Sequence, residues 1–253
     1  MRRAALATAA AGVALLTAAG CGDDAQSTDE GRLVVSAAAS LTEPVTACTK
    51  GFDGATVRLS FAGSDELAAQ IRQGVRPDVF AAANTKLPDA LHDEGLVEEP
   101  RVFATNELVV VVPNDSKLEA VEDLARDGTT VAVGDEDVPV GAYTKTVLDR
   151  LPAVEARAIR ANVRTEEPDV KGVLGKVAQG AADAGFVYAS DVQAAGERVR
   201  AIRLPDALKP RVEYGVAIVK GAPNPEAADR LVTSLVSGPC QAALLAAGFG
   251  PPA

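Results

Sequence analysis

The chain has 253 residues, of which 47% are hydrophobic, and a formal net charge of −10 at pH 7. The hydrophobic fraction is typical of a globular protein and excludes a disordered chain, and the length allows one large domain or two small ones. The acidic balance argues against a nucleic-acid partner and against attraction to anionic lipid by charge.

Residues 1–20 have the pattern of a secretory signal. Arg2 and Arg3 precede an alanine-rich apolar run that ends in Ala18, Ala19 and Gly20. A basic start, a short apolar segment and small residues before a cleavage point predict an export signal that is removed. Its removal leaves 23 basic and 35 acidic residues, so the mature net charge is −12.

Cys21 directly follows these small residues, as in the cleavage box of a bacterial lipoprotein. We therefore expect lipidation of Cys21, with residues 21–30 as a small, polar tether between the membrane and the folded chain. Ala18 stands where such boxes usually carry Leu or Val, so a plain secretory signal cut nearby is the alternative.

From residue 31 onward, short apolar β-rich segments alternate with amphipathic helical segments. The expected strands are 33–37, 56–61, 78–82, 108–112, 130–133, 184–187, 199–204 and 214–219. The expected helices include 67–73, 86–94, 143–150, 173–179 and 225–237. This alternation predicts an α/β fold with mainly parallel sheets flanked by helices.

The order of the segments predicts two lobes. The strand that begins at Leu108 starts a new unit, and the strand at 214–219 follows a polar loop and precedes the last helix. We expect lobe I to comprise 31–105 plus 212–253, and lobe II to comprise 106–211. Two lobes joined by two short crossings can hinge, and ligands favour the cleft between them.

Ser40 marks the first candidate binding segment. It follows an apolar strand, and Ser40 and Glu43 have the Ser-x-x-Glu spacing of a capping box, which predicts Ser40 as a helix N-cap. Ligands of open α/β sheets bind beyond the carboxyl ends of strands, and a helix N-terminus favours an anion. The alternative is an ordinary structural cap.

Other strand ends repeat this pattern. Ser64 precedes the acidic first turn of a helix, Pro139 marks a helix start, and Pro168 with Asp169 marks another. Together they predict helix N-termini from both lobes around one cleft. Tyr188 lies at the end of a strand, where its phenol can donate one hydrogen bond, with a core tyrosine as the alternative.

The chain has three cysteines. If Cys21 is lipidated, Cys48 and Cys240 remain as an even pair in an oxidising compartment, and we predict that they form a disulfide. Two buried free thiols are the alternative. No cysteine or histidine has zinc-site spacing.

Eight phrases then occur in one order, at 37–42, 61–64, 77–80, 108–113, 131–135, 138–141, 187–191 and 212–218. This ordered set resembles the molybdate-binding proteins of ABC-type molybdate importers, and the resemblance covers 31–249. It implies a two-lobed fold of the type II periplasmic binding proteins, with the ligand cleft between the lobes. It also implies a permease and an ATPase as partners, with no catalytic residue and no cofactor.

The resemblance implies a site for molybdate, and for tungstate, made of hydrogen-bond donors without direct metal ligands. Ser40 and Ser64 would donate from lobe I, Val140 and Val170 would donate backbone N–H groups from lobe II, and Tyr188 would donate its hydroxyl. Val140 stands where alanine is often found, and Gly63 stands where some members carry serine. Asp78 is interpreted as a structural residue.

Other functions stay open. A donor-only site favours a fully deprotonated oxyanion over phosphate, but sulfate or thiosulfate would also suit it. Iron is disfavoured by the scarcity of Tyr and His. A secreted serine hydrolase is a remote alternative, because Ser40 and Ser64 lack a Gly-x-Ser-x-Gly context and His92, the sole histidine, lies in a surface segment. We expect a monomer that does not bind nucleic acid.

Overall fold

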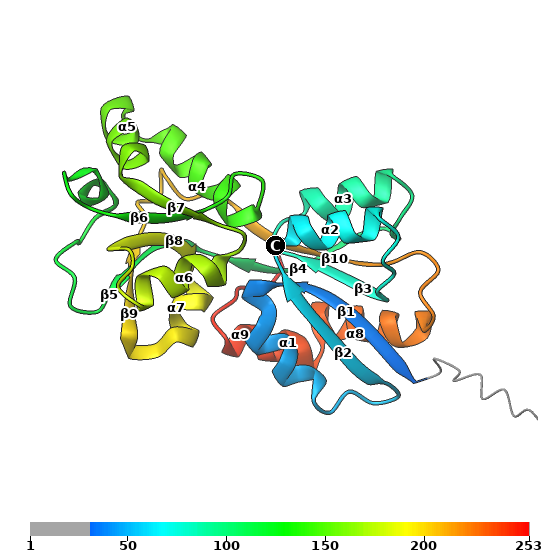
Figure 1. Cartoon of the computed structure of the whole chain (residues 1–253). Helices are drawn as coiled ribbons and strands as arrows, with labels where there is room; N and C mark the ends of the chain where they lie inside the picture. Colours follow the sequence, from blue (N-terminus) through cyan, green and yellow to red (C-terminus); the bar gives the residue numbers. More distant parts are fainter. Residues whose placement is uncertain (1–30, 253) are drawn as a thin grey trace, which may run out of the picture.

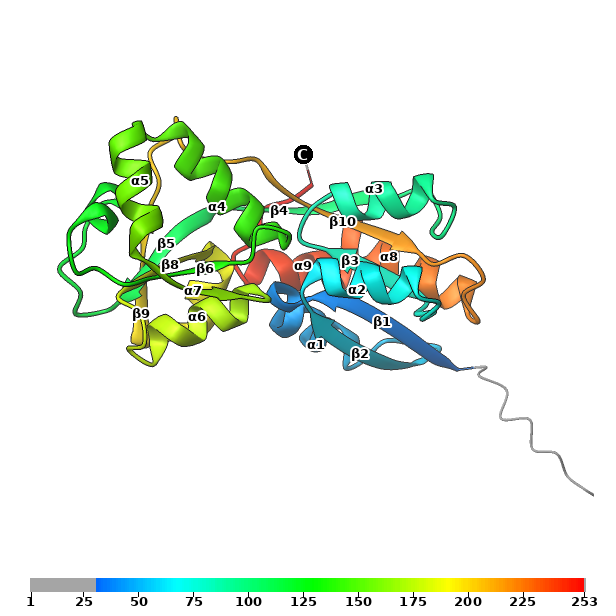
Figure 2. The same ribbon diagram turned by 45° about the horizontal axis from the view of Figure 1, so that its top comes forward.

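The computed structural model describes residues 31–252. The expected signal peptide, the lipidation site Cys21 and the tether lie outside these residues. The described chain forms two lobes side by side, each built on one five-stranded sheet with helices packed on both faces (Figures 1 and 2). No helix between residues 31 and 252 is long and apolar enough to span a membrane.

The sheet of lobe I has the strand order β2-β1-β3-β10-β4. Its strands are β1 (Arg32–Ala38), β2 (Thr56–Ala62), β3 (Val79–Ala82), β4 (Arg101–Asn106) and β10 (Val212–Ile218). β1 runs parallel to β2 and β3, whereas β10 is antiparallel to both of its neighbours. One strand of five is therefore reversed, and it is the strand that returns from lobe II.

The sheet of lobe II repeats this plan with the order β7-β6-β8-β5-β9. Its strands are β5 (Leu108–Pro113), β6 (Val131–Gly134), β7 (Val163–Glu167), β8 (Ala184–Tyr188) and β9 (Val199–Arg203). β6 runs parallel to β7 and β8, and β5 is antiparallel to β8 and β9. The reversed strand is again the first one after a crossing, so both sheets are mainly parallel, as predicted.

Helices connect the parallel strands in both lobes. Lobe I carries the 3-10 helix η1 (Ala39–Leu41) and the α-helices α1 (Thr42–Thr49), α2 (Ser64–Arg72), α3 (Lys86–Asp93), α8 (Pro225–Ser237) and α9 (Pro239–Ala246). Lobe II carries η2 (Val121–Ala125), α4 (Pro139–Arg150), α5 (Ala153–Asn162), α6 (Val170–Ala178), α7 (Ala189–Ala195) and η3 (Gly196–Arg198).

Asp78 has the structural role expected of it. Its side chain is 1% exposed and accepts hydrogen bonds from the backbone N–H groups of Val34 (2.7 Å) and Asn224 (3.1 Å). The carboxylate thus joins β1 to the start of α8 inside lobe I, away from the cleft.

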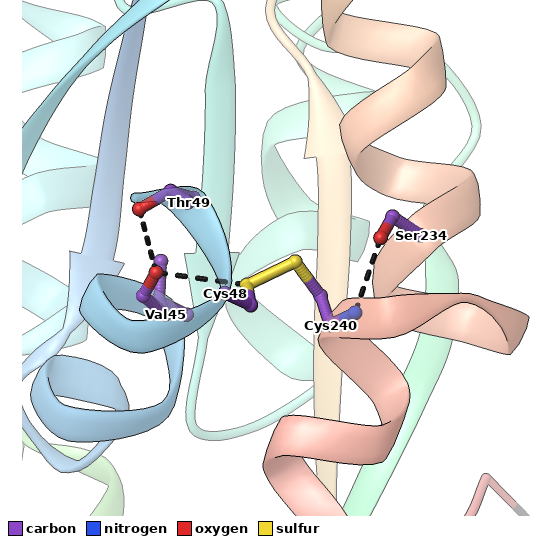
Figure 3. Close-up of a disulfide and its surroundings, with 5 residues drawn as sticks. All are labelled: Val45, Cys48, Thr49, Ser234 and Cys240. Carbon is purple, nitrogen blue, oxygen red and sulfur yellow. Dashed lines mark hydrogen bonds between the residues drawn. A yellow bond between two sulfur atoms is a disulfide. The ribbon is translucent and has the colours of Figure 1, made fainter. Parts of the chain in front are cut away.

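Cys48 and Cys240 are joined in a disulfide that links α1 to α9 within lobe I (Figure 3). The two cysteines are 192 residues apart in the sequence. The backbone N–H of Cys240 donates to Ser234 Oγ at 3.1 Å, which fixes the start of α9 against the end of α8. The bond ties the first α-helix of the described chain to its last.

Candidate functional site

A pocket lies between the two lobes, at the carboxyl ends of the parallel strands. It is lined by Ala38, Ala39, Ser40, Ala62, Gly63, Ser64, Ala83, Val138, Pro139, Val140, Asp169, Val170 and Tyr188. All five residues expected to hold the ligand are among them. The cavity volume is about 20 Å³, little more than the roughly 10–15 Å³ that one water needs on the same measure. A pocket of this size suits a ligand of a few atoms.

The side chain of Ser40 does not cap a helix, so that part of the prediction is wrong. Ser40 lies inside η1, and a 3-10 turn before α1 moves the α-helix start to Thr42. Its Oγ lies 2.9 Å from the hydroxyl oxygen of Tyr214 and makes no capping hydrogen bond to the helix backbone. Glu43, the other half of the expected capping box, pairs with Lys171 instead.

Both pocket serines have hydroxyl groups that can donate toward the ligand. Ser64 Oγ accepts the backbone N–H of Ala83 at 3.1 Å. Ser40 Oγ can accept the proton of the Tyr214 hydroxyl in the same way. A hydroxyl has one proton to donate, so a serine oxygen that already accepts from the protein keeps its proton for a ligand.

Two helix N-termini of lobe II supply backbone donors. Val140 is the second residue of α4, after Pro139, and Val170 is the first residue of α6. The N–H groups of a first helical turn have no intrahelical acceptor and carry the positive end of the dipole. The predicted starts at Pro139 and Asp169 are confirmed, since Asp169 is the N-cap of α6 and its Oδ1 accepts the N–H of Gly172 at 2.9 Å.

Tyr188 is 1% exposed, and its hydroxyl oxygen finds no hydrogen-bond partner within the described part of the chain. Burial raises the pKa of this phenol well above its usual value, with smaller contributions from Tyr214 and Tyr143, so the hydroxyl keeps its proton. A buried hydroxyl without a protein partner is costly. The position of Tyr188 in the pocket lining explains why this cost is tolerated, since a ligand in the pocket can accept a hydrogen bond from the hydroxyl.

Tyr188 of the pocket lining belongs to a cluster of aromatic rings that crosses from one lobe to the other. The ring of Tyr188 in lobe II packs edge-on against Tyr214 in lobe I, with centroids 5.8 Å apart, and against Tyr143 at 6.4 Å. Tyr214 in turn packs against Phe249 at 5.3 Å. These contacts hold the hydroxyl groups of both tyrosines at the cleft.

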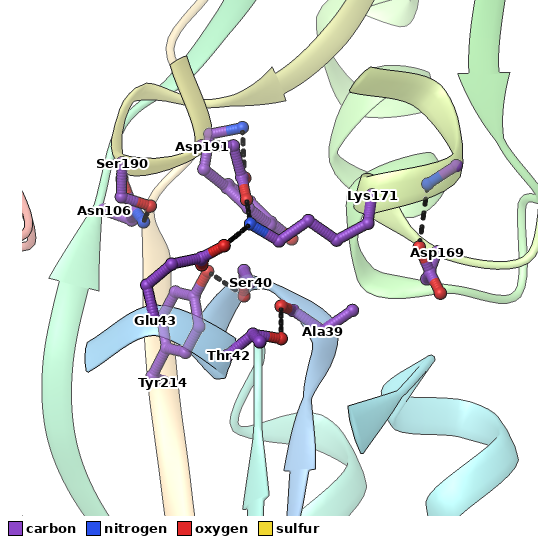
Figure 4. A network of polar contacts seen from close by, with 12 residues as sticks. Ala39, Ser40, Thr42, Glu43, Asn106, Asp169, Lys171, Ser190, Asp191 and Tyr214 are labelled. Atoms are coloured by element: carbon purple, nitrogen blue, oxygen red, sulfur yellow. Dashed lines mark hydrogen bonds and ion pairs between the residues drawn. The ribbon is translucent and has the colours of Figure 1, made fainter. Parts of the chain in front are cut away.

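No lysine, arginine or histidine lines the pocket within residues 31–252. Lys171, at the start of α6, is held by two carboxylates, with its Nζ 2.8 Å from Glu43 Oε2 and 3.3 Å from Asp191 Oδ1 (Figure 4). Burial lowers the pKa of Lys171, but Asp191 and Glu43 outweigh that effect and raise it. Its charge is thus compensated inside the protein, and an anion in the pocket meets dipoles and hydroxyl groups.

Two acidic residues border the site. Asp169 lines the pocket, with one oxygen engaged in capping α6. Asp65, in the first turn of α2, has a buried Oδ1 without a partner among the described residues. Burial, with smaller contributions from Glu66 and Asp135, raises the pKa of Asp65.

The structure also identifies residues that the sequence did not assign to the site. Tyr214 contacts Ser40 across 174 positions of sequence, and Glu43 contacts Lys171 across 128. No local pattern encodes such distant pairs. The nearest sequence signal is that Tyr214 lies in a phrase shared with the molybdate-binding family, which by itself gives the residue no role.

A hydrolase or metal site finds no support in this geometry. His92 lies on α3, where its Nδ1 is 3.3 Å from the carbonyl oxygen of Val97, and it does not line the pocket. Neither serine therefore has a histidine base. Between residues 31 and 252 no three His, Cys, Asp or Glu side chains gather in a way that could hold a metal ion.

Known proteins resemble this chain both in sequence and in architecture. Residues 33–250 match the family described as bacterial extracellular solute-binding protein. The molybdate-binding protein ModA of Mycobacterium tuberculosis is 37% identical over 227 residues, which cover 87% of this chain and 85% of that protein.

Two solved structures show the same fold. The periplasmic molybdate-binding protein of Azotobacter vinelandii matches with a TM-score of 0.78 and 22% identity, over 87% of this chain and all (100%) of that one. The sulfate-binding protein SubI of Mycobacterium tuberculosis matches with a TM-score of 0.74 and 17% identity, over 87% of each chain. The chain therefore belongs to the bacterial extracellular solute-binding proteins and, within them, to the ModA family.

Proposed function

We propose that this chain captures molybdate, and also tungstate, outside the cytoplasmic membrane and delivers it to the permease and ATPase of an ABC importer. The observation that carries the proposal is the convergence of donors on one small cavity. Ser40, Ser64 and Tyr188 offer hydroxyl groups, and Val140 and Val170 offer backbone N–H groups. The ModA relatives make molybdate the first ligand to test.

The donor set explains how an acidic protein can hold a dianion. A hydrogen bond to a charged acceptor contributes roughly 1.5–3 kcal/mol. Seven of them, counting the backbone N–H groups of Ser40 and Ser64 together with the five donors above, suffice after desolvation and closure for about −8 kcal/mol, which is micromolar affinity. Salt should weaken this binding little, because contact with local dipoles, rather than a long-range field, provides it.

The same donors provide selectivity. Molybdate, tungstate and sulfate carry no proton at neutral pH and only accept hydrogen bonds, whereas phosphate retains a proton that needs an acceptor. Molybdate is larger than sulfate because Mo–O bonds are longer than S–O bonds. We propose that the walls are spaced for the larger ion.

Calorimetric titration of the mature protein with molybdate, tungstate, sulfate and phosphate tests the proposal. We expect stoichiometric binding of molybdate and tungstate with similar affinity, weaker binding of sulfate, and weakest binding of phosphate. Sulfate binding as tight as that of molybdate would reassign the protein to sulfate. Ser40→Ala and Ser64→Ala should each weaken binding without unfolding the protein, and normal binding by both variants would rule out this pocket.

We further propose that Cys21 carries the lipid that anchors the protein to the outer face of the cytoplasmic membrane. The proposal rests on the sequence before Cys21. Metabolic labelling with a fatty acid should modify the wild-type protein but not Cys21→Ala. The variant should also appear in the soluble extracytoplasmic fraction. Equal labelling of both proteins would exclude Cys21 as the lipidation site.

A further inference from the structure

Three charged residues form a chain of contacts across the cleft, beside the pocket but outside its lining. Glu43 is on α1 of lobe I, whereas Lys171 is on α6 and Asp191 on α7 of lobe II. Lys171 Nζ lies 3.0 Å and 2.8 Å from the two carboxylate oxygens of Glu43 and 3.3 Å from Asp191 Oδ1. Figure 4 shows the lysine side chain reaching between the two carboxylates.

We propose that Glu43, Lys171 and Asp191 form a closure latch that holds the two lobes together over the bound oxyanion and sets the rate of its release. This inference rests on the proposed function, because it concerns the same pocket. The three are positioning residues, since none of them lines the cavity.

The latch contacts the elements that supply the ligand donors. Lys171 directly follows Val170, and Glu43 lies one helical turn after Ser40. The second carboxylate oxygen of Asp191 accepts the backbone N–H of Tyr188 at 3.2 Å. Each latch residue is therefore attached to a segment that presents a donor, so the latch couples lobe closure to donor placement.

Opening of the lobes would break only one link of the latch. The contact between Lys171 and Asp191 lies within lobe II, whereas the contact between Lys171 and Glu43 joins the lobes. In the inter-lobe pair the Lys171 side chain is 27% exposed and that of Glu43 is 51% exposed, so solvent screens the attraction between the lobes in part. Loss of the Glu43 charge should therefore favour the open state while it leaves lobe II intact.

Glu43→Gln is the direct test, and Glu94→Gln is its matched control. Glu94 also forms a two-oxygen pair, with Arg72 at 2.8 Å, but both residues belong to lobe I. The two glutamates have similar side-chain exposure, 51% for Glu43 and 42% for Glu94. Each variant removes one negative charge and one ion pair, and the main difference between them is the position of the pair relative to the cleft.

Release of molybdate can be followed by stopped-flow tyrosine fluorescence, because the chain has no tryptophan and all of its three tyrosines lie in the cleft cluster. We expect Glu43→Gln to release the ligand about three- to tenfold faster, with an association rate within about twofold of the wild type. Small-angle scattering of the ligand-free protein should show a larger radius of gyration for Glu43→Gln. Glu94→Gln should match the wild type in every measurement.

The latch is overturned if Glu43→Gln leaves the release rate or the scattering unchanged, or if Glu94→Gln changes them equally. Urea unfolding of both variants verifies that neither effect reflects a loss of folding. If the wild-type protein binds no oxyanion in the calorimeter, the proposed function fails. In that case the radii of gyration of the ligand-free wild type, Glu43→Gln and Glu94→Gln still test whether the latch holds the lobes together.

Discussion

At the scale of a single residue, Tyr188 allows an effect on ligand binding to be separated from an effect on folding, because its hydroxyl is buried without a partner between residues 31 and 252. Tyr188→Phe removes the donor and keeps the ring packing. We expect molybdate affinity to fall about 10- to 100-fold, as loss of a hydrogen bond to a charged acceptor implies. The free energy of unfolding of the ligand-free protein should stay equal or rise, because an unsatisfied polar group is removed. Calorimetry and urea unfolding test the two parts, and unchanged affinity would exclude Tyr188 as a donor.

Asp191 makes the stability of the ligand-free protein depend on pH. Burial raises the pKa of this carboxyl from 3.8 to about 6, although Lys171 opposes the shift. Between these values the folded protein binds more protons than the unfolded chain. The contribution of Asp191 to the unfolding free energy therefore falls as pH rises from about 4 to about 6. Asp191→Asn should remove this decrease in urea unfolding measured across that range.

Asp149 offers the opposite sign as a control. The side chain of Lys145 lowers the pKa of Asp149, so the favourable contribution of this exposed pair is present at neutral pH and is lost as pH falls. Asp149→Asn should weaken the loss of unfolding free energy that occurs as pH falls into the acid range. Asp191→Asn should leave this loss in place. Identical pH profiles for Asp191→Asn and the wild type would contradict the shift assigned to Asp191.

At the scale of elements, the start of α2 approaches lobe II so closely that only glycine fits before it. A Cβ atom at Gly63 would lie 2.5 Å from the carbonyl oxygen of Pro168 and 2.7 Å from Asp65 Oδ1. Gly63→Ala should prop the lobes apart and lower molybdate affinity about tenfold or more, while the unfolding free energy changes little. Calorimetry measures the first effect and urea unfolding the second.

Gly51→Ala is the matched control for that variant. A Cβ atom at Gly51 meets no other atom within 4 Å, so this substitution should leave affinity unchanged. Wild-type affinity in Gly63→Ala would mean that the cleft can close with the additional methyl group in place.

The sequence predicted those elements whose signals are local. Apolar runs marked eight of the ten strands between residues 31 and 252, and Pro139 and Asp169 marked helix starts that the structure confirms. β7 was missed because this edge strand reads Val-Arg-Thr-Glu-Glu and only partly buries alternate residues. α9 was missed because its mostly apolar sequence, Pro-Cys-Gln-Ala-Ala-Leu-Leu-Ala, has no helical period.

In the site, too, the residues with local sequence signals could be predicted, whereas contacts that depend on tertiary structure could not. Ser40, Ser64, Val140, Val170 and Tyr188 lie at strand ends and helix starts, and all of them line one pocket. The contact of Ser40 with Tyr214 and the latch residues depend on tertiary structure. The prediction of Ser40 as an N-cap is wrong for the same reason. Its spacing to Glu43 is that of a capping box, but its buried hydroxyl contacts Tyr214 of β10.

At the scale of the whole molecule, the disulfide between Cys48 and Cys240 closes a loop of 192 residues. A double Cys→Ser variant should lose roughly 5 kcal/mol of unfolding free energy on the loop-entropy model. Molybdate affinity should change little at a temperature where the variant is folded, because neither cysteine lines the pocket. Denaturant titrations with and without reductant provide the measurement. A wild-type protein insensitive to reductant would show that the bond is absent in solution or inaccessible.

The two crossings also determine when a chain leaving the cell can become functional. The strands of lobe II follow one another without interruption, from Leu108 to Arg203, whereas β10 must insert between β3 and β4 to complete the other sheet. A polypeptide that emerges amino-terminus first can therefore assemble lobe II while lobe I still lacks an inner strand. Ser40 gains its partner only with this late insertion, because Tyr214 arrives with β10. The late arrival of β10 thus completes the sheet of lobe I, and with it the cleft between the two lobes.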